Sequence, residues 1–244
     1  ELVDSMIYLP VDYYKAYTPV FSKLNIIGIS FTRYDIWPNL VKNAVDRGIP
    51  LFLIGAETAS LQRYLKPGSF FNHILRHFSF ISCNTSGTAE LLTDAGFSNV
   101  YSDGSPKLER SAQVAASEYK NTVLEAWQRD SLVVIGGSIW PTEIVMLEKF
   151  FFDHRIKNLK LILVPHEPSP DVIKSLQETY RGINVLFSQL SEHDSERRVI
   201  IMDKVGYLSK IYRFADVAFV GGGFGKGIHN ITEPAAAGLP VISG

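Results

Sequence analysis

The stretch Val217–Ala237, VAFVGGGFGKGIHNITEPAAA, decides the fold class of this chain. It predicts a buried strand, a turn with five glycines in seven residues, and the start of a helix. Glycines let backbone N–H groups approach a ligand closely, and a helix N-terminus favours an anion such as phosphate. The segment therefore predicts a phosphate-binding turn in an α/β domain. The simpler alternative is a tight strand-to-helix turn without a ligand, although an ordinary turn needs fewer glycines.

Two known phosphate motifs are excluded by the spacing within this turn. A dinucleotide fingerprint that begins at Gly221 would need glycine at position 226, which is Lys226. A P-loop with its lysine at Lys226 would need glycine at position 220 and Ser or Thr at 227, and these residues are Val220 and Gly227. The turn therefore argues against an NAD-dependent enzyme and against a nucleoside triphosphatase.

Three polar side chains follow the glycines, and they have two interpretations. Asn230 and Glu233 have the spacing of a capping box, which would make them structural. Alternatively, Glu233 accepts hydrogen bonds from ribose hydroxyls, as carboxylates do in nucleotide sites. On that second interpretation, the adjacent His229 donates to a phosphate. The sequence leaves both interpretations open.

Outside this segment, short apolar runs alternate with amphipathic stretches along almost the whole chain. Strands are predicted at 25–31, 51–54, 80–83, 100–102, 132–135, 159–164, 183–187, 199–202, 217–220 and 240–242. Helices are predicted at 37–47, 71–78, 86–95, 116–128, 143–152, 171–180, 208–214 and 233–237. Apolar strands bounded by helices predict parallel sheets that are covered on both faces. The pattern weakens around 103–117, which predicts two doubly wound domains, 1–110 and 118–244, joined by a linker at 111–117.

Three further polar segments are expected at carboxyl ends of strands in the second domain, where ligands of open α/β sheets bind. These segments carry Ser138, His166 and Gly206. Together with the glycine turn they predict one ligand site, formed by Ser138, His166, Gly206, Gly222, Gly223, His229, Asn230 and Glu233.

Composition and charge exclude several classes of protein. The 244 residues carry 24 Lys+Arg and 25 Asp+Glu, a net charge of −1, so no basic excess indicates nucleic-acid binding. A single cysteine, Cys83, excludes an intrachain disulfide and a multi-cysteine zinc site. No apolar run approaches the roughly 18 residues of a membrane span, and no signal peptide is recognised. The sequence starts without Met and stops after a strand-like run, so we expect a segment truncated at both ends.

These residues, in this order, resemble the Kdo transferases, which move 3-deoxy-D-manno-octulosonic acid (Kdo) from CMP-Kdo onto the lipid A precursor. The resemblance covers essentially the whole chain. Asp35–Leu40 resembles the family's E-L-W-P-N-L, Leu161–Pro168 its L-I-L-V-P-R-H-P stretch, and Asp203–Leu208 its D-T-M-G-E-L. The most specific segment is Gly222–Glu233, which resembles the family's GG…GGHN…E motif.

The resemblance implies a GT-B fold, with two Rossmann-like domains and the active-site cleft between them. It implies metal-independent transfer with inversion in lipopolysaccharide biosynthesis, at the cytoplasmic face of the bacterial inner membrane. CMP-Kdo would be the donor substrate, so no resident cofactor is expected, and lipid A precursor would be the acceptor. The eight site residues named above would hold CMP, with Lys107 a weaker candidate near the cleft. The family's catalytic base is a Glu expected upstream of Glu1, so no catalytic residue is assigned and the segment by itself is expected to be inactive.

The sequence also departs from the family at several positions. Arg33 and Tyr207 stand where the family has glutamates, and Ile228 stands where it has glycine. We expect the contacts to the sugar and the acceptor to differ from those of the family more than the backbone contacts to phosphate do. Two alternatives remain: a sugar-nucleotide epimerase of the GT-B type with a UDP substrate, and a nucleotide-binding segment without catalysis.

Overall fold

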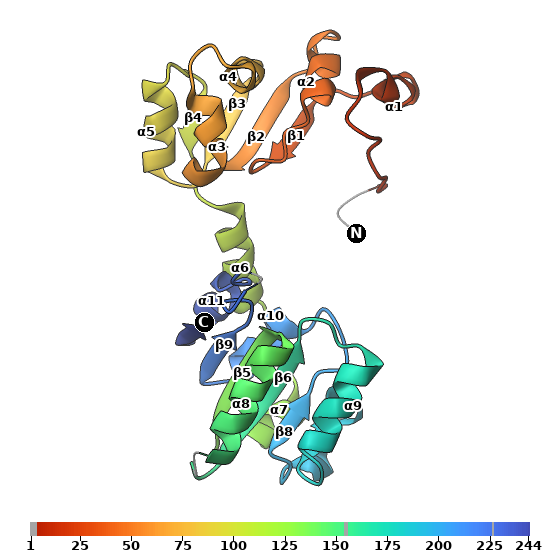
Figure 1. The fold of residues 1–244 in the computed structure, drawn as a ribbon, viewed down its shortest axis with the longest axis vertical. Coiled ribbons are helices and arrows are strands. Elements are labelled where there is room, and N and C mark those ends of the chain that lie inside the picture. The colour runs from red at the N-terminus through yellow and green to blue at the C-terminus, as the bar shows by residue number, and fades with distance from the viewer. Residues whose placement is uncertain (1–3, 154–155, 226) are drawn as a thin grey trace. The chain divides into compact units, whose positions relative to one another are not determined.

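The computed structural model describes residues 4–153, 156–225 and 227–244. The chain divides into two compact units, Glu1–Pro106 and Lys107–Gly244. Each unit contains a parallel β-sheet with helices packed against it (Figure 1).

The first unit is built on a four-stranded sheet in the order β1-β2-β3-β4. Its strands are β1 (Ile29–Thr32), β2 (Leu51–Ala56), β3 (Phe80–Cys83) and β4 (Val100–Ser102). Its helical elements are η1 (Tyr14–Tyr17), α1 (Thr18–Lys23), α2 (Pro38–Val45), α3 (Thr58–Leu65), α4 (Phe70–Leu75) and α5 (Ser86–Asp94). Buried strand residues such as Leu53 and Ile81 pack with helix residues such as Val41, Tyr64 and Leu92 in one core.

The second unit is built on a six-stranded parallel sheet in the order β10-β9-β5-β6-β8-β7. Its strands are β5 (Leu132–Ile139), β6 (Leu159–Pro165), β7 (Asn184–Leu186), β8 (Val199–Ile201), β9 (Val217–Val220) and β10 (Val241–Ser243). Its α-helices are α6 (Pro106–Ala116), which begins at the boundary, α7 (Thr122–Gln128), α8 (Pro141–Asp153), α9 (Pro170–Thr179), α10 (Leu208–Ile211) and α11 (Thr232–Ala236). Three 3₁₀ turns complete it: η2 (Phe187–Gln189), η3 (Glu192–Asp194) and η4 (Tyr212–Phe214).

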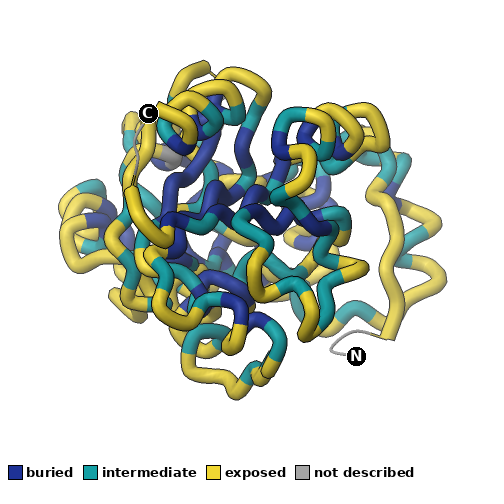
Figure 2. Tube along the Cα trace, turned by 90° about the horizontal axis from the view of Figure 1, so that it is seen from below, coloured by how far each residue is buried: buried dark blue, intermediate teal, exposed yellow. Residues whose placement is uncertain are grey.

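Both faces of the second sheet are buried. Leu161 and Leu163 of β6 pack in one core with residues of α8 and α9, such as Phe151. Ile162, between them, packs in another core with residues of α7, such as Trp127. Figure 2 colours buried positions dark blue and exposed positions yellow. Burial on both faces explains why these strands are almost continuous apolar runs rather than alternating ones.

The fold class predicted from the sequence is confirmed, because both sheets are parallel and helices join their strands. Several boundaries differ. The first strand begins at Ile29, where the pairing with Leu51 begins, rather than at residue 25. Helix α3 was not predicted.

The predicted linker at 111–117 is helical over most of its length. Helix α6 covers these positions to Ala116, and the two units meet between Pro106 and Lys107. Side-chain hydrogen bonds, which composition alone does not predict, hold the helix to the second unit. Ser111 Oγ lies 3.0 Å from Thr232 Oγ1, and Arg213 donates to a carbonyl near the end of α6 at 3.2 Å.

Candidate functional site

Most of the predicted site residues lie at the carboxyl edge of the second unit's sheet. Strands β9, β5 and β6 are neighbours there, and they lead into the glycine turn, the start of α8 and His166, respectively. Ser138 was expected beyond the end of its strand, but it lies inside β5. The pairing with β6 shifts register at this point, and Ser138 has a φ of 52°.

Three aromatic rings stack at this edge. The His166 ring lies 4.4 Å from that of Trp140 and 4.4 Å from that of His229, measured between centroids, with interplanar angles of 29° and 16°. Each ring comes from a different strand end, so the stack ties three loops together. Both histidines were predicted from the sequence, but Trp140 was not.

A hydrogen bond fixes the protonation of His229. The Trp140 indole donates to His229 Nε2 at 2.9 Å. Because an indole N–H can only donate, Nε2 must be unprotonated, and the neutral ring carries its hydrogen on Nδ1. Burial lowers the pKa of His229, and the neighbouring His166 lowers it further, against an opposing effect of Glu143. The result is a neutral imidazole with one N–H left to donate.

Glu143 is the buried centre of the site, with 1% of its surface exposed. Its Oε2 accepts from the N–H of Trp140 at 2.6 Å, which caps the start of α8, and its Oε1 accepts from the N–H of Gly222 at 2.7 Å. One carboxylate thus joins a helix N-terminus to the glycine turn. Glu143 was not predicted as a site residue, although Pro141 and Glu143 are in helix-start positions that could have indicated a cap.

The glycine turn is shaped by its own packing. Gly221 donates to the Gly137 carbonyl at 2.9 Å, and Gly222 donates to Glu143, so both N–H groups are used internally. A Cβ on Gly222, which has a φ of 96°, would collide with the carbonyl of Gly227, and a Cβ on Gly223 would collide with the backbone of Gly244. These glycines are therefore required even without a phosphate.

Two neighbouring N–H groups of the turn, those of Gly223 and Phe224, are candidates to bind a ligand. Within the described ranges, no hydrogen bond uses the N–H of Gly223 or of Phe224. Beside them lies a hollow of about 470 Å³, lined by Trp140, Pro141, Thr142, Glu143, Gly222, Phe224 and Gly225. The turn can therefore offer backbone donors to an anion, from fewer positions than its five glycines indicated.

Asn230 and Glu233 contact each other at the start of α11, but they do not form the predicted capping box, because the N-cap residue is Ile231 and it has no side-chain cap hydrogen bond. Asn230 Nδ2 donates to Glu233 Oε1 at 2.9 Å, and Asn230 Oδ1 accepts from the N–H of Thr232 at 3.2 Å and from its hydroxyl at 2.6 Å. Both side chains therefore stabilise the start of α11. No residue of the described chain donates to Glu233 Oε2, so that oxygen is available to a ligand.

Gly206 and Lys107 belong to other segments than the three stacked rings. Gly206 is exposed between β8 and α10, has a φ of 84°, and has no atom within 4 Å of where a Cβ would stand. Lys107 is exposed near the start of α6. No hydrogen bond or ring contact within the described residues joins either of them to Trp140, His166 or His229.

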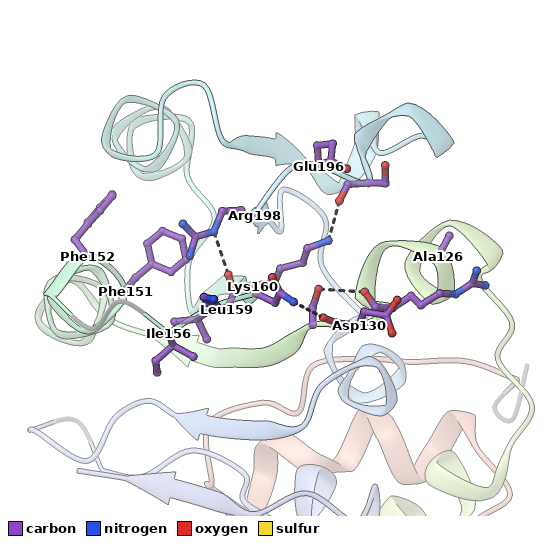
Figure 3. A pocket seen from close by; sticks show the side chains of 14 residues that line it. Ala126, Asp130, Phe151, Phe152, Ile156, Leu159, Lys160, Glu196 and Arg198 are labelled. Carbon is purple, nitrogen blue, oxygen red and sulfur yellow. Dashed lines mark hydrogen bonds between the residues drawn. The ribbon is translucent and has the colours of Figure 1, made fainter.

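A larger hollow, of about 780 Å³, lies at the opposite edge of the same sheet (Figure 3). It contains none of the predicted site residues. Two of the cations that line it are held by the fold. Lys160 donates to the carbonyls of Trp127 and Ser195 at 2.6 and 2.7 Å, and Arg198 donates to that of Leu159 at 3.2 Å. Ligands of parallel α/β sheets bind at carboxyl ends of strands, so we place the site at the ring stack.

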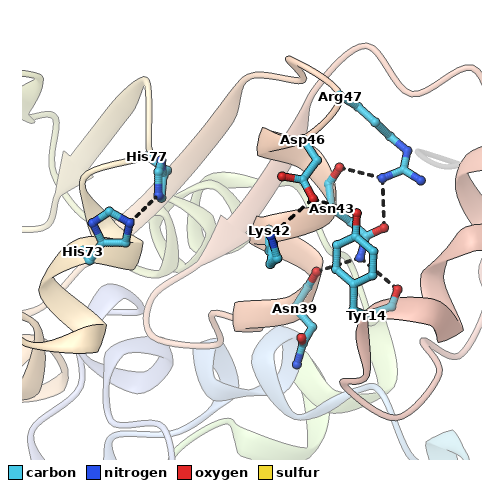
Figure 4. A network of polar contacts seen from close by, with 8 residues as sticks. All are labelled: Tyr14, Asn39, Lys42, Asn43, Asp46, Arg47, His73 and His77. Atoms are coloured by element: carbon cyan, nitrogen blue, oxygen red, sulfur yellow. Dashed lines mark hydrogen bonds and ion pairs between the residues drawn. The ribbon is translucent and has the colours of Figure 1, made fainter.

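The W-P-N-L segment has structural roles in the first unit. The Asn39 side chain donates to the Asp12 carbonyl at 2.8 Å. Asn43, one turn later and fully buried, donates to the carbonyls of Tyr14 and Asn39 at 2.9 Å each and accepts from Arg47 (Figure 4). Helix α2 is thereby fastened to the segment that precedes β1.

Neither a group of metal ligands nor a membrane-spanning helix is found in the part of the chain that the structure describes. Within 4–153, 156–225 and 227–244, no three His, Cys, Asp or Glu side chains are grouped as metal ligands would be. In the same ranges, no helix has the length and apolar character needed to cross a bilayer.

Comparisons with known sequences agree with one another. The 3-deoxy-D-manno-octulosonic-acid transferase (kdotransferase) family matches residues 1–110. A 3-deoxy-D-manno-octulosonic acid transferase of Aquifex aeolicus is 29% identical over 86% of this chain and 53% of its own length, and that of Haemophilus influenzae is 26% identical over 86% and 51%. A bifunctional glycosyltransferase/methyltransferase of Fusobacterium nucleatum is 27% identical over 98% of this chain and 38% of its own. The chain thus spans about half the length of these relatives, or less.

A solved structure shows the same fold at low sequence identity. A putative UDP-N-acetylglucosamine 2-epimerase from Listeria monocytogenes matches 94% of this chain and 60% of its own, with a TM-score of 0.58 and 11% identity. The C-terminal CMP-Kdo binding domain of WaaA from Acinetobacter baumannii matches 56% of this chain and 69% of its own, with a TM-score of 0.43 and 22% identity. The chain is thus similar to 3-deoxy-D-manno-octulosonic acid transferases over most of its length, and it has two parallel α/β units of the GT-B fold.

Proposed function

We propose that this chain is part of a glycosyltransferase that moves Kdo from CMP-Kdo to the lipid A precursor in lipopolysaccharide biosynthesis. The observation that carries the proposal is the sequence similarity to these transferases, which extends over both units. Relatives named 3-deoxy-D-manno-octulosonic acid transferase align with 86% or more of the chain. Because the acceptor is a lipid, we propose that the whole protein works at the cytoplasmic face of the inner membrane.

On this proposal, CMP lies against the carboxyl edge of the second sheet. The N–H groups of Gly223 and Phe224 and the Nδ1–H of His229 are the donors for the phosphate. Glu233 Oε2 accepts from a ribose hydroxyl, while Oε1 stays bonded to Asn230. Transfer forms a bond from an acceptor oxygen to the anomeric carbon and breaks the bond to the CMP oxygen, with inversion and without a metal. The acceptor proton leaves to a general base, which we do not assign within this chain.

Calorimetric titration of the chain with CMP, UMP and UDP, in the presence of EDTA, tests the proposal. We expect CMP to bind most tightly. Glu233→Ala should weaken CMP binding by about 1–3 kcal/mol, because a charged hydrogen-bond partner is lost. Glu178→Ala, at an exposed position on α9, is the matched control and should leave binding unchanged. Preference for UDP would instead favour an epimerase, and unchanged affinity in Glu233→Ala would leave that residue with its contact to Asn230 alone.

A further inference from the structure

The larger hollow, at the edge of the second sheet opposite the ring stack, has a positively charged lining (Figure 3). Its charged side chains are the cations Arg129, Lys157, Lys160 and Arg198 and the carboxylates Asp130 and Glu196. They leave an excess of two positive charges, although the chain as a whole has a net charge of −1. The volume of about 780 Å³ is that of a small-molecule site.

Two of these cations are held in place without a carboxylate partner. Lys160 donates to the carbonyls of Trp127 and Ser195 at 2.6 and 2.7 Å, and Arg198 Nε donates to that of Leu159 at 3.2 Å. Backbone carbonyls position a cation, but they do not neutralise it. None of the ion pairs among the described residues includes Lys160 or Arg198. Both are therefore fixed cations without a direct counter-charge in that part of the chain.

The remaining donors of these two side chains are available to a ligand in the hollow. Lys160 keeps one ammonium N–H, and Arg198 keeps the four N–H groups on Nη1 and Nη2, which no hydrogen bond within the described ranges uses. Burial lowers the pKa of Lys160 against an opposing effect of Glu196, so the charge of this ammonium is only partly compensated. A planar guanidinium matches the oxygens of an anion such as phosphate. An anion bound here would supply the missing counter-charge.

Apolar side chains form one wall of the hollow. The Arg198 guanidinium lies 4.5 Å from the centroid of the Phe151 ring. The next residue, Phe152, is 52% exposed, and its ring stacks on that of Tyr180 with centroids 5.6 Å apart. This ring is therefore held in place while half of it faces solvent. An exposed ring beside a fixed guanidinium suits an anion that also carries an apolar group.

We propose that this hollow is a second ligand site, which binds a phosphate monoester with an apolar substituent, its phosphate on Arg198 and Lys160 and its apolar group on Phe152. A phosphate monoester carries about −1.5 to −2 charges at neutral pH, which balances the positive excess, whereas a carboxylate carries one negative charge and an alcohol none. A soluble ester and the headgroup of phosphatidic acid share this chemistry. The inference does not depend on the proposed function, because the hollow shares no residue with the glycine turn or the ring stack.

An NMR titration of the 15N-labelled chain with phenyl phosphate, inorganic phosphate and phenol tests the inference. We expect phenyl phosphate to shift the amides of 129–131, 157–160 and 195–198. It should bind about tenfold more tightly than either of the other two probes, since it alone combines a phosphate with an apolar ring. Shifts assigned to single residues keep this hollow apart from the glycine turn, 221–225, where the phosphate of CMP is proposed to bind.

Three variants and a control locate the binding energy. Arg198→Gln should weaken phenyl phosphate binding about tenfold, because charge-assisted hydrogen bonds are lost. Lys157→Gln, exposed at the rim, should weaken it by a smaller factor without disturbing the core. Phe152→Ser should weaken phenyl phosphate binding about fivefold and leave that of inorganic phosphate unchanged. Arg110→Gln, exposed on α6, should bind like the wild type. Unchanged amide shifts away from the hollow show that each variant is folded.

The inference is overturned if phenyl phosphate shifts no amide at the hollow, or if phenol binds there as tightly as phenyl phosphate. Wild-type affinity in both Arg198→Gln and Lys157→Gln would overturn it as well. Sedimentation with phosphatidylcholine vesicles, with and without phosphatidic acid, separates the two sources of the phosphate. Pelleting that needs phosphatidic acid and is lost in Arg198→Gln would assign the site to a lipid headgroup, whereas phenyl phosphate binding without such pelleting would assign it to a soluble ester.

Discussion

Replacing Glu143 with Ala should strongly destabilise the second unit. Its carboxylate is 1% exposed and accepts from the N–H groups of Gly222 and Trp140 at 2.7 and 2.6 Å. Alanine removes both acceptors at once. Two N–H groups then lose their partner, one at the start of α8 and one in the glycine turn.

The magnitude follows from these two groups. A buried donor left unpaired destabilises a protein by about 1–3 kcal/mol, so Glu143→Ala should lower the free energy of unfolding by about 2–6 kcal/mol. Glu143→Gln keeps one carbonyl oxygen and leaves one N–H unpaired, so about 1–3 kcal/mol is expected. Both losses are large against the roughly 5–15 kcal/mol that stabilises a typical domain.

Urea unfolding measured by tryptophan fluorescence tests this prediction. In a Trp37→Phe background, the remaining tryptophans, Trp127 and Trp140, both lie in the second unit. Glu178→Gln is the control for loss of a charge at an exposed helix position, and should stay within about 0.5 kcal/mol of the wild type. A Glu143→Ala chain as stable as that control would refute the reasoning that this carboxylate joins the turn to the helix.

Three further predictions use the same unit or its neighbour. Trp140→Phe keeps an aromatic ring but removes the donor to His229 Nε2, so the pKa of that histidine should rise toward its ordinary value. Histidine 15N chemical shifts measure this pKa, and an unchanged value would mean that the hydrogen bond does not lower it. Burial holds the pKa of both His77 and His229 below the ordinary value of about 6.5, so just below that pH the folded state binds fewer protons than the unfolded state. The free energy of unfolding should therefore fall as the pH falls through about 6.5. A Tm that stays flat between about pH 5 and 8 would contradict this. Gly222→Ala should destabilise the second unit more than Gly182→Ala in the urea assay, because both positions have a positive φ but only at Gly222 would a Cβ collide with the backbone. Equal losses of stability would show that the positive φ, and not the collision, determines the effect.

The sequence predicted the strands well because a strand buried on both faces needs apolar residues at every position. It failed where glycine served packing. Gly136 and Gly137 indicated the end of a strand, but they lie inside β5. A Cβ on Gly136 would stand 2.6 Å from a methyl group of Leu147, and one on Gly137 would collide with the hydroxyl of Tyr212. Both partners come from elements distant in sequence, so no local pattern could show why glycine is needed.

The candidate site was predicted only in part, because some of its contacts join segments that are distant in sequence. His166 and His229 were found because they stand in segments that resemble a family. Trp140 and Glu143 were missed because their importance arises from contacts across neighbouring strands. Arg33, in the first unit, was noted only as a departure from the family, and the partner that balances its charge, Glu57, follows a different strand.

In the glycine turn, the glycine content and the hydrogen bonds of the N–H groups indicate different things. Its five glycines predicted a phosphate cradle, but the structure gives two of them another purpose, since Gly222 and Gly223 have no room for a side chain. What distinguishes a ligand-binding turn from a packed one is the fate of its N–H groups. Those of Gly221 and Gly222 are used within the fold, whereas those of Gly223 and Phe224 have no partner among the described residues. The case for an anion at this turn therefore rests on these two donors and on the neutral histidine near them, and glycine content alone is weak evidence for it.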